Sequence, residues 1–211
     1  MDVVICKDAD GVGYHSSQHV IQAVNDTPSD SDRFVLGLPT GGTPLHLYGH
    51  LIAAFHAQEI DFSQVHTINL DEYVGLGPNH ERSYRYFMMH NLFRFVNIPL
   101  QQTHVPNGLA RNVDKECADY EQRVKSMGVD LWVVGIGPNG HVAFNEPGSS
   151  RRSKTRKVEL APETREANAR FFDSPDEVPK EALSAGISTV LDHSQEIILL
   201  ATGRAKAQAV S

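Results

Sequence analysis

Short apolar runs alternate with longer amphipathic stretches along this chain. The apolar runs are continuous, which predicts strands buried on both faces over residues 3–6, 33–38, 65–70, 131–136 and 197–201. Between them, apolar residues recur every three or four positions, which predicts helices over residues 14–24, 44–56, 83–95 and 113–127. This alternation predicts an α/β fold, with a doubly wound, mostly parallel sheet, helices on both faces and a Rossmann-like topology.

Length, charge and cysteine content narrow the class of protein. The 211 residues are enough for one sizeable core and show no repeat or linker, so we expect a single domain over residues 1–211. The net charge of -7 argues against a nucleic-acid or membrane partner. Cys6 and Cys117 are far apart and indicate a reducing compartment. With no signal peptide or membrane span, we expect a cytoplasmic monomer or homo-oligomer.

A loop rich in glycine and polar residues follows the apolar run at 131–136. The spacing of the dinucleotide-binding fingerprint is matched by Gly135, Gly137 and Gly140. That fingerprint needs a helix that begins at the third glycine and turns its N-terminus toward a pyrophosphate. Here Pro147 and Gly148 interrupt the chain within a few residues. We therefore expect no dinucleotide site.

The same loop carries a candidate acid–base group, His141. A lone histidine is more often structural than catalytic, but Asn139 and Glu146 are near enough in sequence to orient its ring. A histidine with an acid five residues further on can handle a proton if the loop folds back on itself. No second histidine or cysteine lies at zinc-ligand spacing, so we expect no metal.

Polar motifs also follow the other expected strands, at residues 39–44, 71–73 and 202–206. Ligands of open α/β sheets bind outside the carboxyl ends of the strands. Together with the loop that carries His141, four motifs are therefore expected to converge on one site. This convergence is a stronger signal than any of the motifs taken alone.

The motif at 39–44 has the composition of a phosphate cradle. Its central residues are Thr40, Gly41, Gly42 and Thr43. We expect Thr43 to cap a helix that begins at Pro44, so that glycine amides and the helix dipole face an anion. A tight strand-to-helix turn is the plainer alternative, and for an isolated pair of glycines it is the more common one. The three neighbouring motifs favour the anion site.

Two adjacent carboxylates, Asp71 and Glu72, end the expected strand at 65–70. Neighbouring residues of a strand point to opposite faces, so only one of the two is expected to reach a ligand. A carboxylate partly withdrawn from water is suited to act as a general base. Taken alone, the motif is more often a helix cap or a surface acid.

Two further basic features have alternative readings. The run at residues 151–157 is typical of a solvated face, but it would also suit a phosphorylated effector or a subunit interface. Arg170 lies on an expected helix and adjoins apolar residues, where a guanidinium can be held rigidly against a phosphate.

In this order, the motifs closely resemble those of the glucosamine-6-phosphate deaminase (isomerising) family. The blocks that carry the resemblance are residues 36–44, 70–75, 135–148, 168–172 and 178–183, together with Thr202, Gly203 and Lys206. The resemblance extends over essentially the whole chain. It implies conversion of glucosamine 6-phosphate to fructose 6-phosphate and ammonia, without a cofactor.

Site roles follow from the resemblance position by position. It implies that Asp71 moves a proton between sugar carbons 2 and 1, and that His141 opens the ring, oriented by Asn139 and Glu146. It also implies a phosphate grip formed by Thr40, Gly41, Gly42, Thr43, Arg170 and Lys206. Ring opening, enolisation and loss of the amine are all proton transfers, so these side chains suffice.

The chain departs from the family pattern in three places. Many members have an aspartate at the position of Asn139, and effector-regulated members have a lysine at that of Val158, beside counterparts of Ser149, Ser150 and Arg156. Members also continue beyond the position of Ser211, so we expect C-terminal elements to be absent here. Two alternatives stay open: a lactonase resembling 6-phosphogluconolactonase, and a non-catalytic sugar-phosphate sensor.

Overall fold

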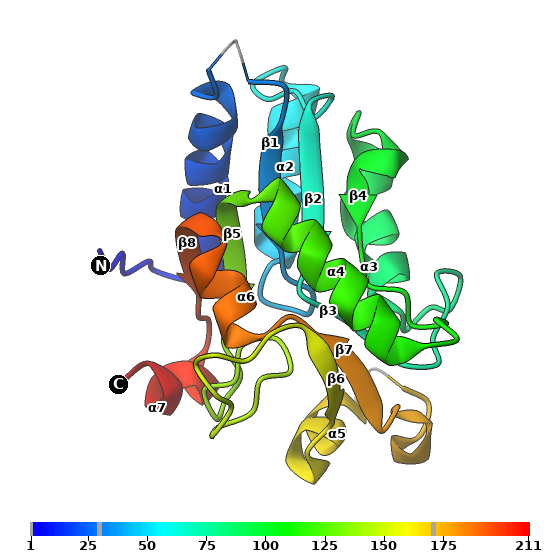
Figure 1. Cartoon of the computed structure of the whole chain (residues 1–211). Coiled ribbons are helices and arrows are strands. Elements are labelled where there is room, and N and C mark those ends of the chain that lie inside the picture. Colours follow the sequence, from blue (N-terminus) through cyan, green and yellow to red (C-terminus); the bar gives the residue numbers. More distant parts are fainter. Residues whose placement is uncertain (1, 29–30, 170–171) are drawn as a thin grey trace.

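The computed structural model describes residues 2–28, 31–169 and 172–211 (Figure 1). At its centre, five strands form a parallel sheet in the order β4-β2-β1-β5-β8. The strands are β1 (Phe34–Leu38), β2 (Val65–Asn69), β4 (Thr103–His104), β5 (Val129–Gly135) and β8 (Ser194–Leu200). In register, Leu38 lies opposite Asn69 and Gly135 lies opposite Leu200, so the strand ends are level within each of these two pairs.

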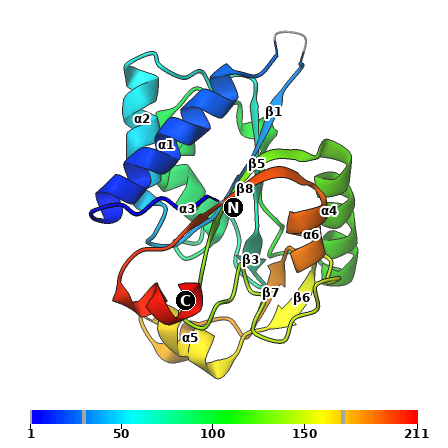
Figure 2. The same cartoon turned by 90° about the vertical axis from the view of Figure 1, so that its left-hand side faces the viewer.

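Helices cover both faces of this sheet, as Figure 2 shows. One face is covered by α1 (Ala9–Asn25), α2 (Leu45–His56) and α3 (Tyr84–Asn91), and the other by α4 (Val113–Met127) and α6 (Ile187–Asp192). Strand residues alternate between the two cores: Leu36 packs with the first group of helices, and Val35 with the second. The doubly wound, mostly parallel α/β fold is therefore confirmed.

A second, antiparallel sheet lies below the carboxyl ends of the main strands (Figure 1). Its order is β3-β7-β6, formed by β3 (Asp71–Tyr73), β7 (Glu181–Ser184) and β6 (Arg156–Glu159). The amide of Ala185 donates to the carbonyl of Leu70 at 2.7 Å, which joins the end of β7 to the link between β2 and β3. The hydropathy pattern did not predict this sheet, because its strands are only three or four residues long.

Shorter elements complete the fold. The helix α5 (Pro162–Ala169) lies beside the small sheet, and α7 (Ala207–Val210) follows the main sheet near the end of the chain (Figure 2). Single 3₁₀ turns occur at Phe93–Phe95, Leu100–Gln102, Pro175–Glu177 and Arg204–Lys206.

Two local expectations were wrong. Residues 3–6 do not form a strand; Val3 and Ile5 are exposed, and no strand of the described ranges pairs with them. A strand needs a partner for its backbone groups, and an apolar run alone supplies none. Thr43 does not cap α2 either: Pro44 occupies the cap position without a side-chain bond, and α2 begins at Leu45.

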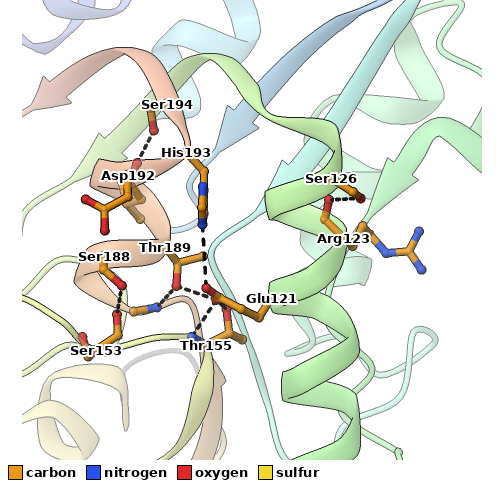
Figure 3. A network of polar contacts seen from close by, with 12 residues as sticks. Glu121, Arg123, Ser126, Ser153, Thr155, Ser188, Thr189, Asp192, His193 and Ser194 are labelled. Carbon is orange, nitrogen blue, oxygen red and sulfur yellow. Dashed lines mark hydrogen bonds and ion pairs between the residues drawn. The ribbon is translucent and has the colours of Figure 1, made fainter.

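A partly buried carboxylate, Glu121 on α4, joins the segment before β6 to helix α6 (Figure 3). Its Oε2 accepts hydrogen bonds from Thr155 N at 2.9 Å, Thr155 Oγ1 at 2.7 Å and Thr189 Oγ1 at 2.7 Å, and His193 Nε2 lies 4.0 Å from its Oε1. Burial favours the neutral acid, but these partners outweigh burial and lower the pKa of Glu121. The approach to β6, the helix α6 and α4 are therefore held at one point.

Replacing Glu121 by alanine should destabilise the fold by about 2–3 kcal/mol, because buried hydroxyl and amide donors lose their acceptor. Urea denaturation of Glu121→Ala measures this loss, and Gln122→Ala, an exposed change on the same helix, serves as the control. Since the folded-state pKa of Glu121 is lowered, its contribution is complete above the unfolded pKa of about 4.3 and is lost as pH falls. Equal stability of the two variants at pH 7 would contradict this role.

Candidate active site

One cavity of about 600 Å³ lies at the carboxyl ends of the parallel strands. From β1 the chain continues through β2 and β4 on one side, and β5 and β8 lie on the other, so the order reverses between β1 and β5. Crevices at such a reversal are where open α/β sheets bind ligands. The cavity is lined by the expected residues Thr40, Gly41, Gly42, Thr43, Asp71, His141 and Lys206. We call it the main cavity.

The loop after β1 forms one wall of the main cavity. Gly41 has a φ of +93°, a conformation that L side chains rarely adopt, and a Cβ built at Gly41 or Gly42 would meet no atom within 4 Å. The loop leads directly into α2, whose first amide groups have no partner within the helix. Glycine backbone beside a helix N-terminus is suited to hold an anion.

His141 belongs to a hydrogen-bonded relay in the loop after β5. Its Nδ1 lies 2.7 Å from Oδ1 of Asn139, and Nδ2 of Asn139 donates to Oε2 of Glu146 at 2.9 Å. Because the amide group of Asn139 donates to the carboxylate, its oxygen faces the ring and accepts a hydrogen bond from Nδ1–H of His141. Nε2 is thereby left as the basic nitrogen. Burial, opposed by Glu146 and aided by Lys206, lowers the pKa of His141 and favours this neutral form.

The absence of a side chain at Gly137 leaves room for the imidazole of His141. A Cβ at this position would lie 2.3–2.5 Å from three atoms of the His141 ring, so only glycine lets the ring pack against the backbone here. The amide of Gly137 also donates to the carbonyl of His141 at 2.8 Å, which closes the loop. The glycine spacing thus serves the histidine, in agreement with the expectation that it marks no dinucleotide site.

The two adjacent carboxyl groups face different spaces. Asp71 lines the main cavity, whereas Glu72 lines a second cavity of about 290 Å³ that also contacts Arg85 and His104. This is the arrangement expected from strand alternation. Both side chains are buried, with 7% of Asp71 and 2% of Glu72 exposed. Burial, together with the negative charge of Glu72, raises the pKa of Asp71 to about 8.

Sequence reasoning missed an aromatic wall of the main cavity. Tyr73 lies 5.0 Å from Tyr84 and 5.5 Å from Phe144 between ring centroids, and Tyr84 stacks on Phe144 at 6.1 Å. All three line the cavity, as does Phe172. In the sequence, Tyr73 directly follows Glu72, and Phe144 comes shortly after His141. This closeness to candidate site residues is the one signal that could have indicated them.

The helix α5 also reaches the site, and this was missed as well. Thr164 is buried, lines the main cavity and donates a short hydrogen bond from Oγ1 to Oε1 of Glu146. Asn168 donates to the hydroxyl of Tyr73 at 3.0 Å. These contacts span 18 and 95 residues, so no local pattern in the sequence could indicate them.

Two further expected features are Arg170 and the basic run at 151–157. Arg170 is outside the described residues, and α5 ends just before it at Ala169. The basic run at 151–157 is engaged within the fold: Arg151 pairs with Asp192 at 3.0 Å, and Lys157 pairs with Glu181 at 2.6 Å. Arg152 and Lys154 are exposed, as a solvated face requires, and the effector site and the subunit interface stay predictions.

Neither a metal cluster nor a membrane helix is found in the part of the chain that the structure describes. Its histidine, cysteine, aspartate and glutamate side chains form no group of three placed to hold a metal ion. None of its helices combines the length and the apolar character needed to cross a bilayer.

Comparison with known proteins agrees with the fold and the motifs. The sequence profile of the family described as glucosamine-6-phosphate isomerases/6-phosphogluconolactonase matches residues 7–211. A Candida albicans protein named glucosamine-6-phosphate isomerase is 50% identical over 192 residues, which cover 90% of this chain and 76% of that protein.

Solved structures give the same result. A monomeric glucosamine-6-phosphate deaminase superimposes with a TM-score of 0.94 at 40% identity, covering 100% of this chain and 86% of that one. A 6-phosphogluconolactonase from Thermotoga maritima superimposes with a TM-score of 0.73 at 18% identity, covering 95% and 84%, which shows a shared fold. The chain therefore belongs to the family of glucosamine-6-phosphate isomerases and 6-phosphogluconolactonases.

Proposed function

We propose that this protein is a glucosamine-6-phosphate deaminase, which converts glucosamine 6-phosphate to fructose 6-phosphate and ammonia. The observation that carries the proposal is the main cavity, where a buried carboxyl group, an oriented histidine and an anion-binding loop meet. The relatives named for this activity support it at 50% and 40% identity. The likeness to lactonases, at 18% identity, concerns the fold alone.

In this proposal, the substrate phosphate binds at the loop after β1. Thr40, Gly41, Gly42 and Thr43 offer amide and hydroxyl donors there, and Lys206 contributes a positive charge from the other side of the strand reversal. Arg170 belongs to the same proposed grip. A phosphate held away from the reacting carbons supplies binding energy that positions them.

His141 is proposed to open the sugar ring. As a neutral imidazole with its proton on Nδ1, it can take a proton at Nε2 from the hydroxyl on carbon 1 and return it to the ring oxygen. The relay through Asn139 to Glu146 holds the ring in the required tautomer. Thr164 fixes the far oxygen of Glu146, so the relay is anchored at both ends.

Asp71 is proposed to carry the proton between carbons 2 and 1 of the open chain. Loss of that proton from carbon 2 gives an enol amine; its return at carbon 1 gives an imine that water hydrolyses to the ketone and ammonia. Burial makes Asp71 a stronger base than an exposed carboxylate, as this proton transfer requires. Every step is a proton transfer, an addition of water or the expulsion of a protonated leaving group, with ammonia leaving from carbon 2, so we propose no cofactor.

We further propose that the enzyme works in the cytoplasm, as a monomer or homo-oligomer. Cys6 and Cys117 are both free thiols, which suits a reducing compartment. A related deaminase is monomeric, so a single chain can suffice for this fold.

Asp71→Asn should lower turnover about 100- to 10,000-fold with little change in substrate binding, because the amide cannot accept the proton in the transition state. Ammonia release measures turnover, and calorimetric titration with substrate measures binding. Turnover near the parent value in folded Asp71→Asn would remove Asp71 from this role and make Glu72 the first candidate.

Lys206→Ala should weaken substrate binding by roughly 1.5–3 kcal/mol through loss of a charge-assisted contact. Its control is Arg204→Ala, an exposed change in the same turn. The parent enzyme should also show a far lower kcat/KM for glucosamine without its phosphate. Equal activity on both sugars would sink the proposed phosphate grip.

Asn139→Asp should raise the pKa of His141 by roughly one unit, because it places a carboxylate against Nδ1. Titration of His141 by NMR measures the shift. Asn112→Asp makes the same chemical change at the cap of α4 and should leave His141 unaffected. An unchanged titration in Asn139→Asp would show that the relay is not formed in solution.

A further inference from the structure

Glu72 makes an unusual set of contacts for a residue that faces away from the main cavity. Its Oε1 accepts hydrogen bonds from the amides of Tyr73 at 2.9 Å and Tyr84 at 3.0 Å, and its Oε2 accepts one from the amide of Arg85 at 3.1 Å. Two of these donors are the first two residues of α3. One buried carboxylate thus joins strand β3 to the start of a helix twelve residues further on.

The N-terminus of α3 depends on Glu72 for a nearby negative charge. The first turn of α3 contains no acidic residue, and its cap, Ser83, satisfies only the amide of Tyr86, at 3.0 Å. The Tyr84 and Arg85 amides would otherwise be part-buried donors without an acceptor in the helix. A carboxylate placed there also interacts favourably with the helix dipole. Glu72 therefore acts as a cap supplied from another element.

The same contact sets the geometry of the main cavity. Asp71 and Tyr73 line it from β3, and Ser83 and Tyr84 line it from the start of α3. These two walls come from different elements, and Glu72 bonds to both. On the far side, the Arg85 side chain donates to Oγ1 of Thr103 at 2.6 Å, which fixes α3 to the start of β4. A shift of Glu72 would move Asp71 relative to the wall that it faces.

We propose that Glu72 is a positioning residue for Asp71: its carboxylate clamps β3 to the first two amides of α3 and so fixes Asp71 against the opposite wall of the main cavity. The inference rests on the proposed function, in which Asp71 is the base. Glu72 does not touch the cavity in which the reaction would occur.

The charge of the clamp has a measurable consequence. Burial raises the pKa of Glu72 to about 7, and the amides of Tyr84, Arg85 and Tyr73 limit that rise. Burial and the charge of Glu72 together raise the pKa of Asp71 to about 8. Among the described residues, Tyr73, Tyr84 and Tyr120 also interact with the charge of Asp71. Beside Glu72, the second cavity is lined by Arg85, His104, Glu116 and Arg123. In the described ranges, the negative charge that raises the pKa of Asp71 is therefore the one that Glu72 carries.

The test compares Glu72→Gln and Glu72→Asp through the pH dependence of ammonia release. A glutamine places an amide donor against a backbone amide and carries no charge. We expect Glu72→Gln to lose roughly 10- to 100-fold in kcat at its plateau with little change in KM. The acidic limb of its kcat/KM profile should move to lower pH by roughly one unit, because a charge that raises the pKa of Asp71 is removed.

Glu72→Asp separates position from charge. It keeps the carboxylate but is too short to reach both helix amides, so kcat should fall while the acidic limb stays at its parental pH. Glu116→Gln, which neutralises a carboxylate in the second cavity that bonds to Asn107, is the control and should leave both quantities unchanged. A residue that merely supported the fold would lower the amount of active enzyme without moving the limb.

Each outcome decides the proposal. Parental kcat and an unmoved limb in Glu72→Gln would overturn it. If Glu72→Gln does not fold, parental turnover in folded Glu72→Asp would overturn it instead. Asp71→Asn, assayed in parallel, keeps the two hypotheses apart: an active Asp71→Asn refutes the role of Asp71, whereas an inactive Asp71→Asn beside an unaffected Glu72→Gln refutes only the clamp.

Discussion

The reversal of strand order between β1 and β5 is the constraint on which the rest of this structure depends. Strands on the two sides of the reversal are connected in opposite directions, so the loops that leave β1 and β5 diverge and leave a crevice between them. The main cavity occupies that crevice. Both loops are irregular where they line it, because regular backbone there would satisfy its own amides and offer none to a ligand.

The second constraint is desolvation, which the small sheet imposes on the site. Strand β3 pairs with β7 on one side and contacts α3 on the other, so the carboxyl groups of Asp71 and Glu72 are removed from water. Buried carboxyl groups favour the neutral form unless donors or charges oppose it. Glu72 has three backbone donors, and the pKa of Asp71 is raised further than that of Glu72. Two neighbouring residues of the same chemical class are thereby given different properties.

Much of the main sheet and of the site could be predicted from the sequence, because both depend on local patterns. Continuous apolar runs marked β1, β2 and β5, and the motifs at their ends named Asp71 and His141 correctly as cavity residues. The antiparallel sheet, the aromatic wall and Thr164 depend on contacts between segments far apart in the chain, for which a single sequence carries no periodic signal. The strand expected at 3–6 is absent for the opposite reason: its local pattern is favourable, but a strand does not form without a partner.

Glu72 and Glu146 illustrate how the fold uses carboxylates beside its cavity. Neither lines the main cavity, and each orients a neighbour that does: Glu72 through backbone amides for Asp71, and Glu146 through Asn139 for His141. Asp71 itself is held where ionisation is unfavourable. Because its folded-state pKa is raised above the unfolded value of about 3.9, the folded protein binds the proton more tightly, and stability falls as pH rises from about 4 toward 8. In the proposed mechanism, the ionised form that acts as a base is therefore the less stable one, and the hydrogen bonds of Glu72 to β3 and α3 oppose its relaxation toward water. Burial makes the carboxylate basic and also makes its ionised form unstable. The neighbouring groups must therefore be rigid enough to hold it in place.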